Sequence, residues 1–258
     1  MRSNQGMKLQ GYNLLLISLN NESGEKRRSV LNYPYFWIKG LKGTDNNRIV
    51  NFVKSKFYSR YNQDKKGKGY LGAVGVFSSH IKAMEHIVKN NLKNTIILED
   101  DSILKGKLPN PLKLPQDSLT LFSGRIQPPK SWADLEKFHK SCSAQKIIKN
   151  FKRGVNEINY NDHRWTQQNA VYYPNSKVTQ DVLNQIHSAK RLKNIDLFFN
   201  NPSIVKYLYY PAPFVHDDIK ADIGSQISKK GHGKIKDYIL IEPPSEKGFQ
   251  NFYYPYCS

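Results

Sequence analysis

Short apolar runs alternate with segments of helical periodicity along this chain, and this alternation limits the folds that it can adopt. The runs 14–19, 95–98 and 119–122 have the length of a buried strand. The segment 73–90 instead carries apolar residues at spacings of three and four, which is the pattern of an amphipathic helix. Strands that alternate with helices usually build a parallel sheet covered by helices. We therefore predict an α/β fold with a mostly parallel central sheet flanked by helices.

The whole chain, 1–258, is long enough to form one large domain with a buried core. Two of its segments lack clear strand and helix patterns. The segment 128–162 is polar and basic, and we expect it to be an insertion or an acceptor-side loop. The segment 229–258 is first basic and then aromatic, and we expect it to be a C-terminal extension. The sequence thus predicts a single domain with two additions.

The chain is strongly basic, with 40 Lys and Arg residues against 21 Asp and Glu residues and a formal net charge of +19. Such a charge attracts polyanions, which include nucleic acid, an anionic membrane surface, anionic glycans and nucleotide donors. Because no known nucleic-acid-binding motif is present, we expect no specific nucleic-acid partner. Met1–Gln10 lacks the apolar core of a signal peptide, and no apolar run is long enough to span a bilayer. We expect a cytoplasmic protein that can bind a membrane surface only peripherally.

Three adjacent carboxylates, Glu99, Asp100 and Asp101, directly follow the apolar run 95–98. Their mutual repulsion is offset well by a divalent cation, because Mn²⁺ and Mg²⁺ prefer hard oxygen ligands. In open α/β sheets, ligands bind beyond the carboxyl ends of the strands. Glu99 and Asp101 share a face of an extended segment, so we assign them as metal ligands. A metal held there could bridge the two phosphates of a nucleotide-sugar. A solvated acidic turn is the alternative.

Further polar residues are candidates for binding a phosphate or ribose. Ser79 and Lys82 lie on the polar side of the helix predicted over 73–90, whereas His80 falls on its apolar face. A histidine on an apolar face is more often a satisfied core residue than a ligand. Arg27 and Arg28 follow the first strand, where a guanidinium can pair with a diphosphate, although a basic surface helix would show the same pattern.

A late cluster follows the predicted strand 204–209 and two prolines. It consists of His216, Asp217 and Asp218, and a histidine beside carboxylates suits a further metal or phosphate contact. A polar surface loop is the alternative at this place. We assign His216 as a third metal ligand.

Taken together, these segments resemble glycosyltransferase family 25, the lipopolysaccharide and procollagen type galactosyltransferases. The resemblance spans about residues 12 to 225. It rests on strand 14–19 with Arg27–Arg28 after it, the Gly-x-x-Gly-x-x-x-Ser-His segment 72–80, the strand end 97–101, and the later segments 170–172, 195–196 and 221–223. The Ser-His helix and the Glu-Asp-Asp strand end, in this order and spacing, are its most specific part.

The resemblance implies a GT-A-like, nucleotide-sugar-binding fold, an inverting mechanism, a UDP-sugar donor, and Mn²⁺ or Mg²⁺ as cofactor. We expect transfer of a hexose, galactose or glucose, to a hydroxyl of a glycan or protein acceptor. The expected donor-binding residues are Ser18, Arg27, Arg28, Ser79, His80, Lys82 and Asp100. A basic Mg²⁺-dependent nucleic-acid-binding protein or nuclease, and a transferase-like protein that binds without catalysis, are the alternatives.

Asp196 is the candidate general base. An inverting transfer needs one carboxylate or histidine to take the proton of the acceptor hydroxyl. Asp196 lies in the place of the family's Ile-Asp pair, and its neighbours Ile195, Leu197 and Phe198 are apolar. The alternative is a helix N-cap, which suits an aspartate just before an apolar run. His216 and Asp217 are the reserve candidates for the base.

Overall fold

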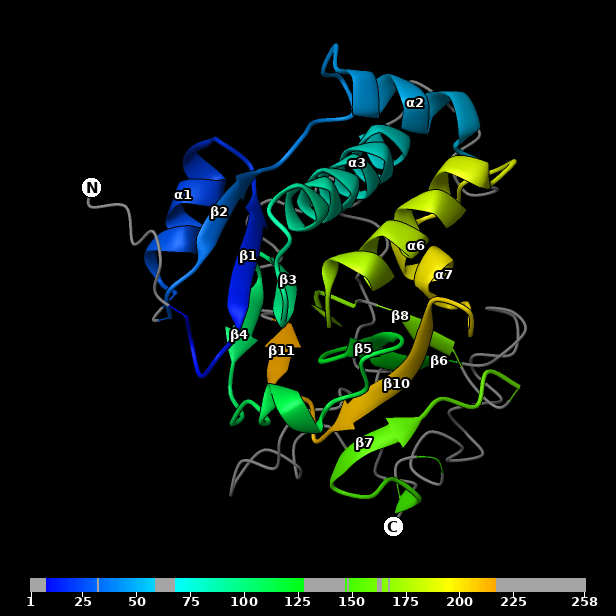
Figure 1. Cartoon of the computed structure of the whole chain (residues 1–258). Coiled ribbons are helices and arrows are strands. Elements are labelled where there is room, and N and C mark those ends of the chain that lie inside the picture. The colour runs from blue at the N-terminus through cyan, green and yellow to red at the C-terminus, as the bar shows by residue number, and fades with distance from the viewer. Residues whose placement is uncertain are drawn as a thin grey trace, which may run out of the picture.

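A seven-stranded sheet forms the centre of the protein, with the strand order β2-β1-β3-β9-β5-β10-β7 (Figure 1). The computed structural model describes residues 8–31, 33–58, 68–127, 147, 149–161, 164–166 and 168–216. The strands, in sheet order, are β2 (Phe36–Lys39), β1 (Asn13–Ser18), β3 (Thr95–Glu99), β9 (Ala170–Tyr173), β5 (Leu119–Leu121), β10 (Val205–Tyr210) and β7 (Gly154–Glu157). The predicted α/β class is confirmed.

The sheet is mixed, so the expectation of a mostly parallel sheet is not confirmed. The pairs β1–β2, β1–β3 and β5–β10 are parallel, whereas β3–β9, β5–β9 and β10–β7 are antiparallel. Strand β9 is fully buried along its length. A run that is apolar on both faces looks the same in either chain direction, so its pattern could not show that β9 runs against its neighbours. The strands β1, β2, β3, β5 and β10 all point the same way.

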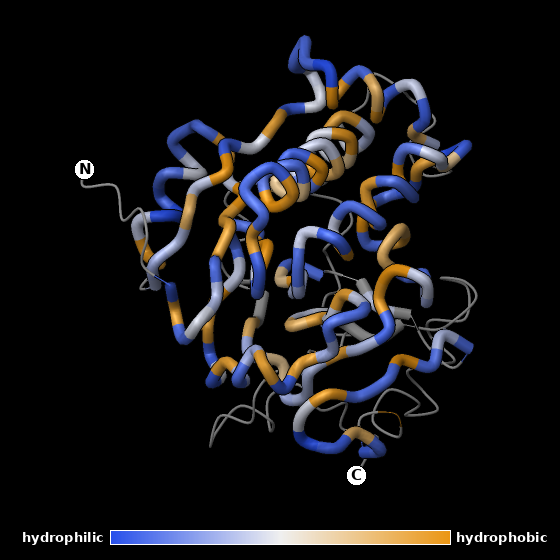
Figure 2. The backbone as a smooth tube through the Cα atoms, in the orientation of Figure 1, coloured by the Kyte–Doolittle hydropathy of each residue, from blue (hydrophilic) through white to orange (hydrophobic). Residues whose placement is uncertain are grey.

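Among the residues that the structure describes, four helices lie on one face of the sheet. They are α2 (Arg48–Lys56), α3 (Lys68–Lys89), α6 (Ser176–Ser188) and α7 (Ile195–Phe199). Helix α3 packs against both α2 and α6, and it includes the helix predicted over 73–90. Helix α6 begins after the N-cap Asn175, whose side chain accepts a hydrogen bond of 2.9 Å from the Val178 N–H. Hydrophobic residues gather along the central strands and α3 (Figure 2).

Short strands and loop segments cover the opposite face. The short strands β4 (Ser102–Leu104) and β11 (Phe214–His216) pair there, and the following segment contains the 3-10 helix η1 (Pro111–Lys113). The aromatic rings of Phe122 and Tyr172 stack at 5.6 Å, and Tyr12 meets both edge-on. A second short pair joins β6 (Arg125–Gln127) and β8 (Arg164–Thr166). The sheet therefore has a hydrophobic core on each face.

Helix α3 crosses the segment after β2 at very close range. A Cβ atom on Gly75 would lie 2.7 Å from the Leu41 carbonyl oxygen, so this turn of the helix accepts no larger side chain without movement. The close approach brings the polar side of α3 to the carboxyl end of β2. Packing against Leu41 thus explains the second glycine of the Gly-x-x-Gly segment, Gly75.

The two predicted additions are only partly within the described residues. Residues 128–146 and 217–258 lie outside them, so the predicted C-terminal extension is not tested. Within the segment 128–162, residues 154–157 form β7, which pairs antiparallel with β10 at the edge of the sheet. In the described part of the chain, no helix combines the length and the apolar character that crossing a membrane requires.

Candidate active site

The carboxyl ends of β1 and β3 lie side by side, because the two strands are parallel neighbours with Ile17 opposite Glu99. Helix α1 (Glu22–Ser29) begins at this edge, capped by the Asn21 side chain, which accepts a 2.9 Å hydrogen bond from the Gly24 N–H. A Cβ atom on Gly24 would lie 2.2 Å from the Leu19 carbonyl oxygen. The first turn of α1 therefore packs directly against the end of β1, which brings its arginines toward the acidic cluster.

Asp100 is held by two groups at this edge. The Ser18 hydroxyl donates to one carboxylate oxygen at 2.7 Å, and the Arg27 guanidinium donates to the other at 2.7 Å. The side chains of Arg27 and Asp100 are only 16% and 14% exposed. Burial raises the pKa of Asp100, against the opposing effects of the Ser18 hydrogen bond and the Arg27 charge. The acidic cluster is therefore not a solvated turn.

Arg28 extends this network away from Asp100. Its guanidinium donates to the Ser18 hydroxyl oxygen and to the Leu19 carbonyl, both at 2.8 Å, and lies 4.2 Å from the centre of the Trp37 ring. These contacts immobilise α1 against β1 and β2. The described contacts of Arg28 are thus to protein groups, and its contact with a donor stays a prediction.

Glu99 is paired with His80 of α3. The imidazole Nε2 lies 3.1 Å from the Glu99 Oε1, and His80 is 1% exposed whereas Glu99 is 29% exposed. The His80 ring also meets Phe199 edge-on at 6.0 Å. His80 is therefore a buried core histidine, which is the more common case for a histidine on an apolar helix face. It orients the Glu99 carboxylate at the site. Its direct contact with a donor has no support in this geometry.

The segment after Asp101 connects the acidic cluster to β11. The Ser102 hydroxyl donates to the Asn169 carbonyl at 2.8 Å, and the Tyr33 hydroxyl donates to the Ser102 carbonyl at 2.9 Å. Ser102 lies opposite His216 in the β4–β11 pair. The structure thus brings the backbone of His216 next to the residue that follows Asp101. The reserve candidate Asp217 lies outside the described residues.

Asp196 lies in the first turn of α7. Its carboxylate accepts a weak hydrogen bond, 3.5 Å long, from the Gln168 N–H. The adjacent Asn169 carbonyl accepts a 2.9 Å hydrogen bond from the Glu99 N–H. One short segment before β9 therefore links the predicted base to the acidic cluster. The N-cap position of α7 is Asn194, so the alternative that Asp196 is the N-cap is wrong.

Ser79 and Lys82 both bind main-chain groups at or after the end of β2. The Ser79 hydroxyl accepts from the Leu41 N–H at 2.8 Å and donates to the Gly75 carbonyl at 2.7 Å, which ties α3 to the segment after β2. Lys82 donates to the Lys39 carbonyl at 2.9 Å, and burial, followed by the Lys39 charge, lowers the pKa of Lys82. A phosphate contact from Ser79 has no support here, whereas Lys82 lies near the carboxyl end of β2.

Gln168 and Asn169 also lie at this edge, although the sequence pattern did not identify them as site residues. Both are 2% exposed, and Glu99 and Ser102 bind the Asn169 carbonyl. They precede the apolar run 170–173, so a parallel strand would have placed them at the far edge of the sheet. Because β9 is antiparallel, its amino end meets the carboxyl ends of β3 and β5. The only sequence signal was a polar pair beside a buried strand.

The donor set at the edge fits a metal that is held jointly with a substrate rather than in a preformed cage. In the part of the chain that the structure describes, no group of three or more His, Cys, Asp or Glu side chains is arranged around one metal position. Both oxygens of Asp100 bind Ser18 and Arg27. Glu99 and Asp101 provide hard oxygens, and Mg²⁺ commonly takes only one or two carboxylates together with phosphates and waters.

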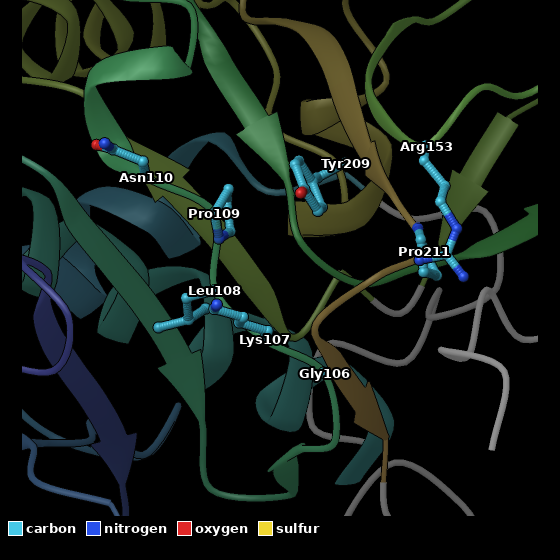
Figure 3. A pocket seen from close by; sticks show the side chains of 8 residues that line it. All are labelled: Gly106, Lys107, Leu108, Pro109, Asn110, Arg153, Tyr209 and Pro211. Carbon is cyan, nitrogen blue, oxygen red and sulfur yellow. The ribbon is translucent and has the colours of Figure 1, made fainter.

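A separate hollow of about 490 Å³ lies at the end of β10, between the segment after β4 and the residue that precedes β7 (Figure 3). The figure shows Arg153 beside Pro211, with Lys107 on the segment across from them. The lining residues are Gly106, Lys107, Leu108, Pro109, Asn110, Arg153, Tyr209 and Pro211. Neither of the two cations is within ion-pair distance of a described carboxylate. The hollow is therefore suited to an anionic ligand.

A comparison with family models decides the identity of the chain. Residues 12–199 match the model of glycosyltransferase family 25 (LPS biosynthesis protein). The chain belongs to glycosyltransferase family 25. The protein is thus a glycosyltransferase, with an α/β fold that is consistent with a GT-A-like arrangement, and the family favours this activity over the nuclease alternative. No curated protein matches the chain. The matched range contains the acidic cluster, α3 and Asp196, but not β10 and β11.

We expect Arg27→Met to destabilise the protein by about 2–3 kcal/mol, because it leaves the Asp100 carboxylate largely buried without its cation. This value lies below the roughly 3–5 kcal/mol typical of fully buried pairs, because both side chains keep some exposure. Arg48→Met is the matched control, since Arg48 pairs with Glu85 while 83% exposed, and its loss should cost less than about 1 kcal/mol. Urea denaturation measures both free energies of unfolding, and equal losses would contradict this assignment.

Proposed function

We propose that this glycosyltransferase moves a hexose from a UDP-sugar to a hydroxyl of a glycan or protein, with inversion at the anomeric carbon and with Mn²⁺ or Mg²⁺. The observation that carries the proposal is the acidic cluster at the carboxyl end of β3. There, Ser18 and Arg27 fix the middle carboxylate, Asp100, at the protein side. The flanking Glu99 and Asp101 supply further carboxylate oxygens at the edge where α/β sheets bind substrates, and we propose that these oxygens bind the metal.

Glu99 and Asp101 would hold the cation, with His216 as a further candidate from β11. When bound, the metal acts as a Lewis acid that stabilises the negative charge on the leaving diphosphate. His80 would keep Glu99 in one orientation, as outer-shell partners of metal ligands commonly do. Lys82, at the end of β2, remains a candidate contact for the diphosphate.

Asp196 would take the proton from the acceptor hydroxyl during the attack on the anomeric carbon. The contact of its carboxylate with the Gln168 N–H supports this role, because the next residue is bound to Glu99. The base and the acidic cluster are thus held on one short frame, so they keep their relative positions during the transfer. A fixed geometry of this kind is what lowers the barrier of a reaction between two bound groups.

The acceptor we propose carries negative charge. The net charge of +19 and the two cations around the hollow at the end of β10, Lys107 and Arg153, support this class of acceptor. Strand β4 runs from Ser102, directly after Asp101, to Leu104, and the hollow begins two residues later at Gly106. The chain from Asp101 to Gly106 spans at most about 18 Å when fully extended, so an acceptor glycan could reach from the hollow to the acidic cluster.

We expect Asp101→Asn to abolish the Mn²⁺-dependent part of UDP binding and the transfer reaction, because the amide is a much weaker ligand for a hard cation. Calorimetric titration of UDP with and without Mn²⁺ measures binding independently of activity. Asp117→Asn is the matched control, since Asp117 is an exposed carboxylate that pairs with Lys206 away from this edge. Full activity of the Asp101→Asn variant with an unchanged metal requirement would show the assignment to be wrong.

Asp196→Asn should lower the rate of transfer by roughly a hundredfold or more and leave UDP affinity unchanged, because only the proton acceptor is lost. Transfer rate, UDP affinity and melting temperature are measured for this variant. Asp181→Asn, at an exposed position of α6, serves as the control. A variant with a normal rate per folded molecule would remove Asp196 from the mechanism.

The double variant Lys107→Ala/Arg153→Ala should weaken the binding of a phosphorylated or carboxylated oligosaccharide and leave a neutral oligosaccharide unaffected. Added salt should also weaken the binding of the anionic oligosaccharide by the wild type, since exposed charges are screened beyond about 10 Å at 0.1 M. Lys113→Ala removes an exposed cation outside the hollow and should have no effect. Equal binding of the anionic ligand by the double variant and the wild type would exclude the hollow as its site.

A further inference from the structure

Two neighbouring side chains at the active-site edge are buried without using their full hydrogen-bonding capacity. Asn169 and Gln168 are each 2% exposed. A side-chain amide carries two N–H donors and an oxygen that accepts two hydrogen bonds. Neither the Oδ1 nor the Nδ2 of Asn169 has a partner among the residues that the structure describes, and the Oε1 of Gln168 has none either. The Gln168 Nε2 donates to the Trp165 carbonyl at 2.9 Å.

A buried amide with both ends unsatisfied is unfavourable for the free protein, because folding removes its bonds to water and returns none. Such groups are rare in folded proteins, and each needs an explanation such as a bound ligand or an ordered water. Asn200, nearby, shows the ordinary case. Its amide binds the backbone of Trp165 and donates to the Asp196 carbonyl at 2.7 Å, so its side chain holds the structure together.

The main chain of Asn169 makes structural hydrogen bonds, whereas its side chain makes none with the described residues. The main-chain carbonyl accepts from the Glu99 N–H at 2.9 Å and from the Ser102 hydroxyl at 2.8 Å. This carbonyl already supplies the contacts that connect β9 to the acidic cluster. The side-chain amide adds nothing to that connection, so a structural role does not account for an asparagine at this position.

The location of the pair points to the sugar of the donor. On one side lies Glu99, which would hold the metal and with it the diphosphate. On the other side lies Asp196, the proposed base, whose carboxylate contacts the Gln168 N–H at 3.5 Å. The anomeric carbon must lie between the leaving diphosphate and the base, and the hexose ring is attached to it. The pair thus lies between the residue proposed to hold the metal and the proposed base, which is where the transferred sugar has to be placed.

We propose that the side-chain amide of Asn169, together with the Oε1 of Gln168, binds hydroxyl groups of the transferred hexose and selects which hexose is used. This inference rests on the proposed function. Sugar hydroxyls both donate and accept, as does an amide. Hexose epimers differ only in the direction of one hydroxyl, so a fixed, buried amide can satisfy one epimer and leave a group unpaired with the other. A site built to bind a hydroxyl rejects strongly the analogue that lacks it.

The test compares UDP with UDP-galactose and UDP-glucose by calorimetry, using the full chain with Mn²⁺. Asn169→Leu replaces the amide by an apolar side chain with the same branching and the same number of heavy atoms. Its UDP affinity should stay within about twofold of the wild type, whereas the affinity for the preferred UDP-hexose should fall about tenfold or more. The ratio between the two hexoses should move toward one. The melting temperature should be equal to or above that of the wild type, because an unsatisfied buried amide is removed.

Thr120→Val is the matched control. The Thr120 hydroxyl is also buried without a described partner, but it lies within β5 opposite Tyr172 rather than at the edge. The control should not change the hexose ratio. Asn169→Ser, which keeps a small polar group, should lose the hexose ratio as well and provides the measurement if the leucine variant does not fold.

Two results would overturn the inference. An unchanged hexose ratio in the Asn169 variants would show that the amide does not contact the sugar. A lower melting temperature with equal losses of UDP and UDP-hexose affinity would show that the amide is structural. If the wild type binds neither UDP nor a UDP-hexose, the proposed donor is wrong and the inference fails with it. If the wild type binds both but the Asn169 variants keep the hexose ratio, only the inference fails.

Discussion

The pairing of Asp100 with Ser18 and Arg27 is the interaction on which the active-site edge depends. It joins the ends of β1 and β3 and the helix α1 at a single carboxylate. Burial raises the pKa of Asp100, so the attraction of Arg27 only partly offsets the loss of water around the carboxylate. The pair fixes the turn that follows β3, because Asp100 is bound to Ser18 and Arg27 directly after the last strand residue, Glu99.

The chemistry of the edge comes from segments that are distant in the chain. Helix α3 brings His80 to Glu99, and the β4–β11 pair brings His216 opposite Ser102. The polar residues before β9 connect the acidic cluster to Asp196. Each of these groups touches a neighbour through main-chain or buried side-chain contacts, so the site is supported by the rigid sheet rather than by free loops. This arrangement suits a transferase, in which donor, acceptor and base must hold one geometry.

Several elements could be predicted from local pattern, and others could not. The strands β1 and β3 and the helix α3 follow from apolar periodicity, which acts within a few residues. Ser79 was expected to face a ligand because it is polar and lies beside His80. Its hydroxyl instead ties α3 to the Leu41 N–H, a contact between residues 38 positions apart that no helical pattern can show.

By itself the sequence determined the α/β class, the acidic strand end and the family, because all three depend on residue order and on the periodicity of burial. The tertiary structure decided the direction of β9, and with it the place of Gln168 and Asn169. A strand buried on both faces has the same apolar pattern in either direction, so only its pairing with β3 and β5 sets which end meets the site. The tertiary structure also decided which groups the adjacent carboxylates bind. Asp100 binds Ser18 and Arg27, whereas Glu99 pairs with His80, and these partners come from different parts of the chain.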